Sequence, residues 1–464
     1  MPSKCCLEES WPNRIDFLLV MLREHPKSYW IRTYGCQMNE LDSEMMRGVL
    51  ERRGLFRAQT EQEADLLIFN TCSIRDLAER KVLGKIGQLN KAGYRPLIGV
   101  TGCMAVAKRE ALFKKLPSID FILGTNNIAD LDEVLDALVQ GHPLPIRVDS
   151  RFREDLDYLI AKRDDRVKAY VSIIRGCNKA CTYCVVPHTR GKEVSRPPKS
   201  VLEESLHLRD QGYKEITLLG QNVNSYGKDR PEWNCRFHDL LYQLDKIQGL
   251  ERIRFMTSHP VDISLELMQA LRDLPSLCEF VHFPLQAGSN RILRKMHRIY
   301  TKEAYLAQVA SLRSLVPNVA LGTDIIVGFP TETEEEFQET YDLYRQIRFS
   351  VGFLFAYSRR KQTPAHRWLD DVPQNVKAER LKSLLALHEK ISSQELQRWM
   401  GKEAEVLVEE ALPEEGLLKG RTRCWKKVIF PGSLNLLGSL QTIRIEGLSH
   451  QTLQGRLLTQ ASNR

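Results

Sequence analysis

The chain of 464 residues has no long apolar run. The stretch from Ile15 to Leu22 is interrupted by Asp16 and is far shorter than the roughly 20 residues that a membrane-spanning helix needs. The opening residues also lack the basic, apolar and small-residue succession of a secretory leader. We therefore expect a cytoplasmic protein with no membrane segment.

A strong excess of one charge is missing as well. Lys and Arg number 67 against 59 Asp and Glu, which gives a formal net charge of +8. An excess of this size permits an anionic partner such as RNA but does not require one. Charge alone therefore leaves the class of partner open.

The chain divides into three sections after a short extension at 1–27 that carries no periodic pattern. In the first, at 28–150, apolar runs alternate with amphipathic helices, which predicts a parallel α/β sheet. We expect strands at 29–34, 64–69, 96–101 and 121–123, and helices at 41–53, 76–91, 105–115 and 128–139.

The section at 163–397 repeats this alternation six times. Six such units are too few to close an eight-stranded barrel, so a (βα)6 partial TIM barrel is expected, with its active face at the carboxyl ends of the strands. Strands are expected at 169–174, 215–219, 252–256, 280–283, 320–327 and 351–356, and helices at 200–211, 263–274, 332–348 and 376–399. The last section, 398–462, has short β-rich runs at 405–409 and 441–446 among glycines and prolines, which predicts a small β-barrel.

Three cysteines of the central section form a Cys-x3-Cys-x2-Cys loop directly after its first strand: Cys177, Cys181 and Cys184. A structural zinc site or a simple electron-transfer cluster takes four protein ligands. Three thiolates on a [4Fe–4S] cluster leave one iron open to an outside ligand. A zinc knuckle completed by His188 is the alternative, but the spacing, Tyr183 and the following barrel favour the cluster.

The Cys-x3-Cys-x2-Cys loop resembles that of the radical S-adenosylmethionine superfamily. The resemblance implies that the open iron binds the amino and carboxylate groups of S-adenosylmethionine. It also implies radical chemistry, which suits C–H bonds that no side-chain base can deprotonate.

A second set of cysteines has no linear motif: Cys36, Cys72 and Cys103 have 35 and 30 residues between them. Each follows an apolar strand and precedes a helix. In a parallel sheet all three emerge at the edge where doubly wound folds bind ligands. Three thiols there would again leave one metal position vacant, although three unrelated buried cysteines are the alternative. The other five, Cys5, Cys6, Cys235, Cys278 and Cys424, show no grouping and are interpreted as structural.

The run from Tyr34 to Glu44 resembles the opening of the radical methylthiotransferases, and among them is most similar to the tRNA-2-methylthio-N6-dimethylallyladenosine synthases. Further matches lie at 172–177, 218–226, 281–286, 322–330 and 355–358, and the similarity runs in one order from about residue 29 to 459. One departure is the run from Ser358 to Pro364, which is more basic than the family pattern.

This resemblance implies an auxiliary [4Fe–4S] cluster on Cys36, Cys72 and Cys103 that delivers sulfur, and a radical-generating cluster on Cys177, Cys181 and Cys184. It implies further that two S-adenosylmethionine molecules serve each turnover, one for the methyl group and one for the radical. The product it implies carries a methylthio group at C2 of N6-dimethylallyladenosine, at position 37 in the tRNA anticodon loop. An electron donor such as flavodoxin or ferredoxin, a sulfur donor, a monomeric chain and one chamber faced by both clusters are expected too.

Candidate cofactor-binding residues lie where strands end. Gly220, Gln221 and Asn222 follow the second central strand, where glycine permits close backbone approach. Similar positions are held by Ser258, His259, Gln286 and Asp324, each of which is equally well read as a structural polar group.

The terminal section carries candidate RNA-binding residues. Between Gly416 and Arg444 there is no acidic residue, and Lys419, Arg421, Arg423, Trp425, Lys426 and Lys427 combine cations with an aromatic ring. This pattern suits phosphate contacts and base stacking, although a solvated basic face is the alternative. The family resemblance implies a TRAM-like RNA-binding domain here.

Three competing functions remain. The first two are methylthiotransferases for a ribosomal-protein aspartate or for threonylcarbamoyladenosine in tRNA. The run from Gly35 to Asn39 and the basic terminal section argue against both. The third is a non-catalytic iron–sulfur or zinc protein that binds RNA.

Overall fold

The computed structural model describes residues 25–73, 76–91, 95–141, 146–149, 163–412 and 416–458. The chain forms two compact units, Met1–Lys162 and Arg163–Arg464. Most of the extension at 1–27 lies outside the described residues, among which no helix is long and apolar enough to cross a membrane.

The first unit is built on one parallel sheet, with strand order β2-β1-β3-β4-β5-β6. The strands are β1 (Ser28–Tyr34), β2 (Phe56–Arg57), β3 (Leu66–Thr71), β4 (Leu97–Thr101), β5 (Phe121–Leu123) and β6 (Ile146–Arg147). The chain reverses its direction across the sheet between β1 and β3, which is the switch point of a doubly wound fold. The predicted parallel α/β sheet is confirmed.

The helices of this unit differ from expectation at two places. Helix α2 (Gln37–Arg52) begins four residues before the expected start at 41, because Asn39 accepts a hydrogen bond from the Cys36 amide at its amino end. The helix expected at 105–115 is broken at Arg109, whose φ is 42°, into α4 (Cys103–Lys108) and α5 (Ala111–Lys115). Helix α3 (Asp76–Lys91) has the expected bounds, and the expected range 128–139 consists of the 3-10 turn η2 (Ile128–Asp130) followed by α6 (Leu131–Val139).

The second unit contains the six parallel strands expected of a partial barrel, arranged as two three-stranded ladders, β11-β10-β7 and β12-β13-β14. They are β7 (Lys168–Ser172), β10 (Glu215–Leu219), β11 (Arg252–Phe255), β12 (Phe280–His282), β13 (Ala320–Val327) and β14 (Val351–Ala356). An isolated bridge joins Ile253 of β11 to Leu277, three residues before β12 begins. The first expected strand is interrupted at Ile173 and resumes as β8 (Ile174–Arg175).

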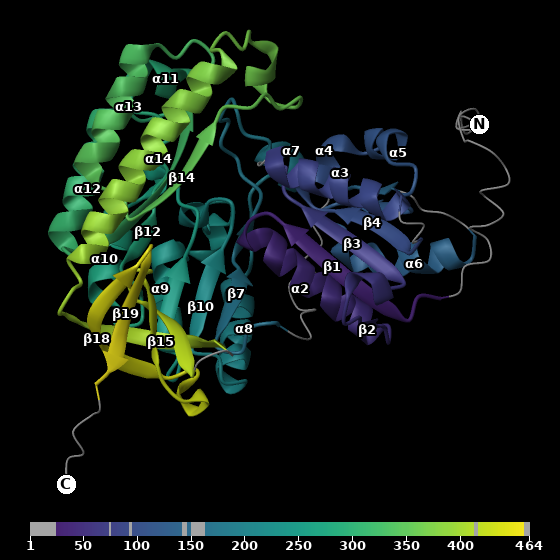
Figure 1. The fold of residues 1–464 in the computed structure, drawn as a ribbon, viewed down its shortest axis with the longest axis horizontal. Helices are drawn as coiled ribbons and strands as arrows, with labels where there is room; N and C mark the ends of the chain where they lie inside the picture. The colour runs from purple at the N-terminus through teal and green to yellow at the C-terminus, as the bar shows by residue number, and fades with distance from the viewer. Residues whose placement is uncertain are drawn as a thin grey trace. The chain divides into compact units, whose positions relative to one another are not determined.

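Amphipathic helices cover the outside of these strands, as Figure 1 shows for α10, α12, α13 and α14. They are α8 (Pro198–Asp210), α9 (Phe237–Leu244), α10 (Leu265–Asp273), α11 (Asn290–Lys295), α12 (Lys302–Leu315), α13 (Glu334–Ile347) and α14 (Gln374–Gln397). Strand residues such as Leu218 and Phe255 and helix residues such as Leu267 and Tyr344 form one apolar core. The resulting partial barrel leaves its strand ends free to carry function.

The last strands form a closed five-stranded barrel, in the order β15-β16-β17-β19-β18. They are β15 (Glu403–Leu412), β16 (Leu417–Thr422), β17 (Lys427–Pro431), β18 (Leu440–Ser449) and β19 (Thr452–Leu457). Alternate residues such as Val406, Leu418 and Ile443 fill its interior. The predicted small β-barrel is confirmed.

Candidate functional site

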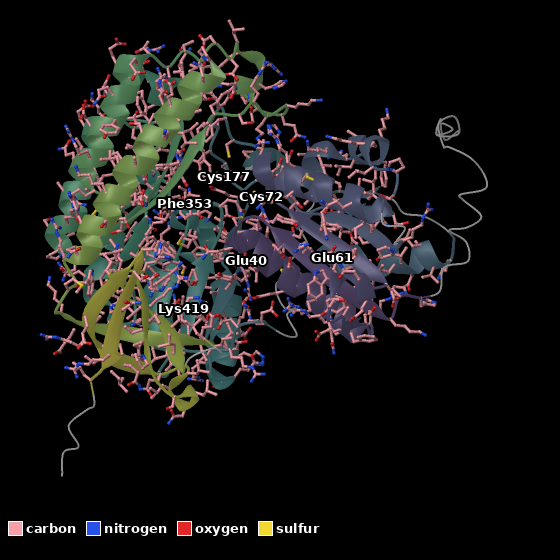
Figure 2. The ribbon with its side chains drawn as sticks, viewed as in Figure 1. Glu40, Glu61, Cys72, Cys177, Phe353 and Lys419 are labelled. Atoms are coloured by element: carbon pink, nitrogen blue, oxygen red, sulfur yellow. The ribbon has the colours of Figure 1, made fainter. Side chains whose placement is uncertain are left out.

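The three amino-terminal cysteines follow three neighbouring strands of the first sheet. Cys36 follows β1, Cys72 follows β3, and Cys103 begins α4 directly after β4. The strands are adjacent and parallel, with Tyr34 opposite Thr71 and Asn70 opposite Thr101. All three cysteines therefore lie at the carboxyl edge of the sheet, and Cys36 and Cys72 flank the switch point. Figure 2 labels Cys72 at this edge.

Glycines let the three cysteine loops pack against one another. A Cβ atom placed on Gly35 would lie 2.9 Å from Cβ of Cys72, and one on Gly102 would lie 2.7 Å from the Thr71 carbonyl oxygen. The Cys72 amide also donates to the Tyr34 carbonyl at 2.8 Å. Larger side chains at either glycine would separate loops that carry cysteines.

A buried amide network supports the first loop. The Asn39 amide nitrogen donates to Oδ1 of Asn70 at 2.9 Å, and the Asn70 amide nitrogen donates to the Asn39 carbonyl at 2.7 Å and to Ser43 Oγ at 2.9 Å. The Cys36 sulfur lies 3.3 Å from Oδ1 of Asn39. A buried network whose hydrogen bonds are all made is rigid. This network therefore fixes the position of the backbone at Cys36.

The surroundings of these cysteines fit an iron–sulfur cluster. The hydroxyls of Thr71 and Thr101 are buried and have no hydrogen-bond partner, so they can donate to an added acceptor such as a sulfide. Within the described ranges no three His, Cys, Asp or Glu side chains converge as ligands of one metal ion do. A [4Fe–4S] cluster would bind each thiolate through a different iron.

The central cysteines lie on the loop that follows β8. The Cys177 amide donates to the Gly191 carbonyl at 3.1 Å, and the Cys184 amide donates to the Cys181 carbonyl at 3.0 Å. A Cβ atom on Gly176, whose φ is 75°, would lie 1.9 Å from the Lys192 carbonyl oxygen. Only glycine therefore allows this close backbone crossing directly before Cys177.

Burial keeps two of these thiols protonated in the absence of a positive partner. Burial, together with the nearby Cys181 sulfur, raises the pKa of Cys177 to about 11 and that of Cys184 to about 12. Metal ions offset this cost, because thiolates are the form that binds iron. The donor set therefore fits a cluster.

A buried arginine that the sequence analysis did not identify contacts this loop. Nη1 of Arg298 lies 3.4 Å from the Cys181 sulfur, while its other nitrogens donate to the Pro284 carbonyl and the Tyr300 hydroxyl. The ring of Tyr300 lies 5.1 Å from the guanidinium carbon. Nothing in the local sequence marks Arg298, which is 117 residues from Cys181.

The predicted cofactor residues at the end of β10 make internal contacts. A Cβ on Gly220 would lie 2.4 Å from the Ile174 side chain, so this position needs glycine for packing. Gln221 accepts a hydrogen bond from the Gly176 amide at 2.5 Å. Asn222 donates to Asp262 at 2.7 Å and leaves its own buried Oδ1 without a partner.

Asp262 links the cysteine loop to the neighbouring strand ends, and the sequence analysis missed it. Its buried carboxylate binds Nζ of Lys179 at 2.8 Å and Nζ of Lys228 at 2.7 Å, in addition to Asn222. Burial alone would raise the pKa of Asp262, but these hydrogen bonds outweigh it and hold the pKa at about 2. Lys179 lies between Cys177 and Cys181, so this carboxylate tethers the loop directly.

Orphaned polar atoms gather where β10 and β11 end. The hydroxyl of Ser258 and both side-chain polar atoms of Asn224 are buried without partners, as is Oδ1 of Asn222. Since buried polar groups normally have partners, these atoms fit a polar ligand such as the amino-acid part of S-adenosylmethionine. Asn224 stands in the run at 218–226 but was not among the predicted residues.

The remaining candidates lie at neighbouring strand ends. The Gln286 backbone has a φ of 71°, and its amide donates to the Asp324 carbonyl at 2.8 Å. The Asp324 carboxylate lies 3.3 Å from Nε2 of His282. Burial lowers the pKa of His259 to about 3, and Nδ1 of that ring accepts from the Val261 amide. His259 is therefore neutral and already engaged.

The predicted RNA-binding residues make mostly internal contacts in the structure. Arg423 donates to both carboxylate oxygens of Glu279 and to two carbonyls of the central section. Trp425 stacks on Phe280 at 5.3 Å and lies 4.9 Å from the Arg254 guanidinium. These contacts join the terminal barrel to the central strands.

The other cations of this set differ in exposure. Lys419 binds Glu410 at 2.6 Å and Arg421 binds Glu409 at 3.3 Å. Burial lowers the pKa of Lys426, whereas Lys427 is exposed. An RNA-binding role for these residues stays a prediction.

Two models of known protein families match separate parts of this chain. Residues 28–124 match the model described as uncharacterized protein family UPF0004, and residues 171–344 match the radical SAM superfamily. The fold resembles a radical S-adenosylmethionine methyltransferase from Kitasatospora setae, with a TM-score of 0.55 and 14% identity over 73% of this chain and 75% of that one.

Two relatives named tRNA-2-methylthio-N(6)-dimethylallyladenosine synthase match nearly end to end. The one from Protochlamydia amoebophila is 66% identical over 433 residues, which cover 93% of this chain and 96% of the relative. The one from Thermoanaerobacter sp. strain X514 is 45% identical over 468 residues, which cover 99% of both. With these identities and the radical SAM match, the chain belongs to the tRNA-2-methylthio-N(6)-dimethylallyladenosine synthase family of radical S-adenosylmethionine enzymes.

Proposed function

We propose that this protein adds a methylthio group to C2 of N6-dimethylallyladenosine at position 37 of tRNA. The observation that carries the proposal is the presence of two separate cysteine triples, one at the carboxyl ends of three parallel strands and one on the loop that follows β8. One triple suffices for radical generation, so the second needs a purpose of its own. The names of relatives at 66% and 45% identity support sulfur insertion into this tRNA base.

Membership of the radical SAM superfamily implies a [4Fe–4S] cluster and S-adenosylmethionine. We assign that cluster to Cys177, Cys181 and Cys184, and an auxiliary cluster to Cys36, Cys72 and Cys103, with two S-adenosylmethionine molecules used per turnover. When bound, these groups supply a radical able to remove hydrogen from an aromatic carbon, together with the sulfur that replaces it. The reaction requires that both clusters reach one substrate.

The chain's own residues bind and orient the cofactor in this proposal. Asn222, Asn224 and Ser258 offer buried polar atoms that lack partners, and these would hold the amino-acid end of S-adenosylmethionine. Gln286 and Asp324 would bind from the adjoining strands, and Gly220 and Gln221 would shape the wall behind the cofactor. Through its contacts with two lysines, Asp262 keeps the cysteine loop at a fixed position relative to Asn222.

The three sections of the chain have separate roles in this proposal. We propose an auxiliary-cluster domain at 28–150, a radical-SAM domain at 163–397 and a TRAM-like RNA-binding barrel at 398–462. Because its substrate is tRNA, we propose that the protein acts in the cytoplasm. We also propose that it acts as a monomer and receives electrons from flavodoxin or ferredoxin and sulfur from a separate donor.

Nucleoside analysis tests this function. In a strain that lacks the protein, mass spectrometry of digested tRNA should show N6-dimethylallyladenosine without its methylthio derivative. The derivative should return with the wild-type chain and not with Cys72→Ala. Loss of methylthio-threonylcarbamoyladenosine, or of a methylthio group on a ribosomal protein, would instead identify one of the competing substrates. Unchanged methylthio groups throughout would favour a non-catalytic RNA-binding protein.

A further inference from the structure

We propose that residues 359–367, called here the rim segment, bind the phosphate backbone of the tRNA beside the radical-generating loop. This inference rests on the proposed function, because it assigns a contact surface to the same substrate. The rim segment follows β14 and includes the 3-10 helix η7 (Pro364–Arg367). It overlaps the basic run from Ser358 to Pro364 that the sequence analysis singled out.

The rim segment carries positive charge that no acid within it offsets. Its cations are Arg359, Arg360, Lys361 and Arg367, and no acidic residue occurs from 357 to 369. Arg359, Lys361 and Arg367 are exposed. Such a group of guanidinium and ammonium donors suits phosphate oxygens.

The segment is also folded rather than merely charged. Thr363 and Ala365 are buried, and the Thr363 amide and hydroxyl both donate to the Arg360 carbonyl, at 3.0 and 2.8 Å. The Arg359 guanidinium donates to the His366 carbonyl, which closes the loop. The cations therefore project from a fixed turn, so less conformational entropy is lost on binding.

One hydrogen bond joins the rim segment to the radical-generating loop. The Ala365 amide donates to the Thr182 carbonyl at 2.9 Å, and Thr182 lies between the ligands Cys181 and Cys184. The Thr182 hydroxyl donates in turn to the Lys295 carbonyl at 2.8 Å. A phosphate held by the rim segment is thus placed close to the loop where the radical is generated.

The terminal barrel lies at the other end of the strands. It contacts Lys168, Arg252 and Phe280, which are the first residues of β7, β11 and β12. Figure 2 labels Cys177 and Lys419 at separate places in this unit, with Lys419 below Cys177 in this view. Several barrel cations are already bound to carboxylates, as Arg423 is to Glu279. The barrel can add distant contacts, but the rim segment is better placed for phosphates next to the reacting base.

Neighbouring side chains favour RNA over an acidic protein as the occupant. Trp368 and the exposed Leu369 directly follow the cations, and Nζ of Lys295 lies 5.6 Å from the Trp368 ring. The Trp368 ring packs on Phe329 at 5.8 Å, so the exposed Leu369 is the apolar surface beside the cations. The tRNA of the proposed function supplies both phosphates for the cations and unstacked bases for this surface.

The test is a charge-removal variant with a matched control. The rim variant is Arg359→Gln/Lys361→Gln/Arg367→Gln, and the control is Lys199→Gln/Arg345→Gln/Arg398→Gln, which removes three exposed cations from helical parts of the same unit. Binding of dimethylallylated tRNA is measured by fluorescence anisotropy over a salt series with the cluster-loaded proteins. Iron content and thermal midpoint establish that both variants are folded.

The salt dependence decides the outcome. Each lost phosphate contact makes the negative slope of log K against log salt shallower by about 0.7, so the loss of three contacts changes the slope by about 2. At 0.1 M salt this corresponds to an affinity loss on the order of 100-fold. The control should keep the wild-type slope. Equal slopes in the rim variant and the control would overturn the inference, as would unchanged tRNA affinity with slower reduction by flavodoxin.

The two proposals fail in different ways. If the wild-type protein forms the methylthio product but the rim variant binds tRNA normally, only the rim assignment is wrong. If the wild-type protein forms no methylthio product while the rim variant still loses its salt-dependent tRNA affinity, the proposed reaction is wrong and the RNA contact stands.

Discussion

Arg298 donates a hydrogen bond to the sulfur of Cys181 at 3.4 Å, although 117 residues separate the two in the chain. The guanidinium is buried, so little water screens its charge. Positive charge and hydrogen bonds at a ligand sulfur favour the reduced cluster, which carries one more electron. If Cys181 binds the radical-generating cluster as proposed, Arg298 would therefore raise the reduction potential of that cluster.

We expect Arg298→Gln to lower the midpoint potential of the radical-generating cluster by on the order of 60 mV, which is a tenfold change for a one-electron couple. A redox titration followed by electron paramagnetic resonance measures this value. Arg298→Lys retains the charge and should lie closer to the wild type. Equal potentials in all three proteins would contradict the assigned role.

Removing one cysteine from each triple should have different effects on the reaction. Cys181→Ala should abolish 5′-deoxyadenosine release, because it removes a ligand of the radical-generating cluster. Cys72→Ala should leave some release but no methylthio product. Each variant should hold roughly four of the roughly eight irons expected for two [4Fe–4S] clusters. Methylthio-adenosine formed by both variants in an anaerobic assay would refute the division of roles.

Gly35 offers a test that leaves every thiol in place. A Cβ there would lie 2.9 Å from Cβ of Cys72, so Gly35→Ala should spread the two loops and lower iron loading of the auxiliary site. Gly84→Ala is the matched control, because nothing lies within 4 Å of its added methyl group on α3. That control should keep full iron and gain about 0.5–1 kcal/mol of helix stability. Full iron in Gly35→Ala would refute close packing of the loops.

Asp262→Asn should weaken the tether on the cysteine loop. The amide cannot replace the charge that binds Lys179 and Lys228, so we expect a higher dissociation constant for S-adenosylmethionine, by roughly tenfold for the loss of about 1.4 kcal/mol. Isothermal titration of the cluster-loaded protein measures it. Glu266→Gln on the exposed start of α10 is the control and should bind normally. Normal binding by both variants would exclude a tethering role.

The contribution of the Asp262 carboxylate to stability should depend on pH. The pKa of Asp262 is about 2 in the folded protein, below its ordinary value of 3.8. Its stabilising contribution is therefore present above pH 4 and is lost as the pH falls toward 2, because the unfolded chain takes up the proton first. The difference in unfolding free energy between wild type and Asp262→Asn, on the order of 2 kcal/mol, should shrink over that range in urea titrations. A difference that grows toward pH 2 would contradict the low pKa.

Trp425 should matter first for stability. It stacks on Phe280 and on the Arg254 guanidinium but is only partly buried, so Trp425→Ala should lower the free energy of unfolding by about 2 kcal/mol. Lys427→Gln, an exposed position two residues later, should leave stability unchanged. Urea denaturation compares them. A fully stable Trp425→Ala with weakened tRNA binding would instead support base stacking.

Local patterns predicted the element types well. Short apolar runs in alternation with amphipathic helices depend on neighbours within a few residues, so all six central strands and the parallel first sheet could be predicted. The break at Arg109 and the early start of α2 could not, because each depends on one backbone conformation or one cap contact. The positions of the cysteines after strands were predictable for the same local reason.

By itself, the sequence determined the order of strands and helices, the positions of both cysteine triples after strands, and the family. Only the tertiary structure brought Arg298 to Cys181, Asp262 to Lys179 and Ala365 to Thr182. It also engaged much of the predicted RNA-binding face in internal contacts, as Trp425 on Phe280 shows. The physical reason is that periodicity records which side of an element is buried, whereas these contacts join residues dozens to hundreds of positions apart, whose meeting depends on how whole elements pack.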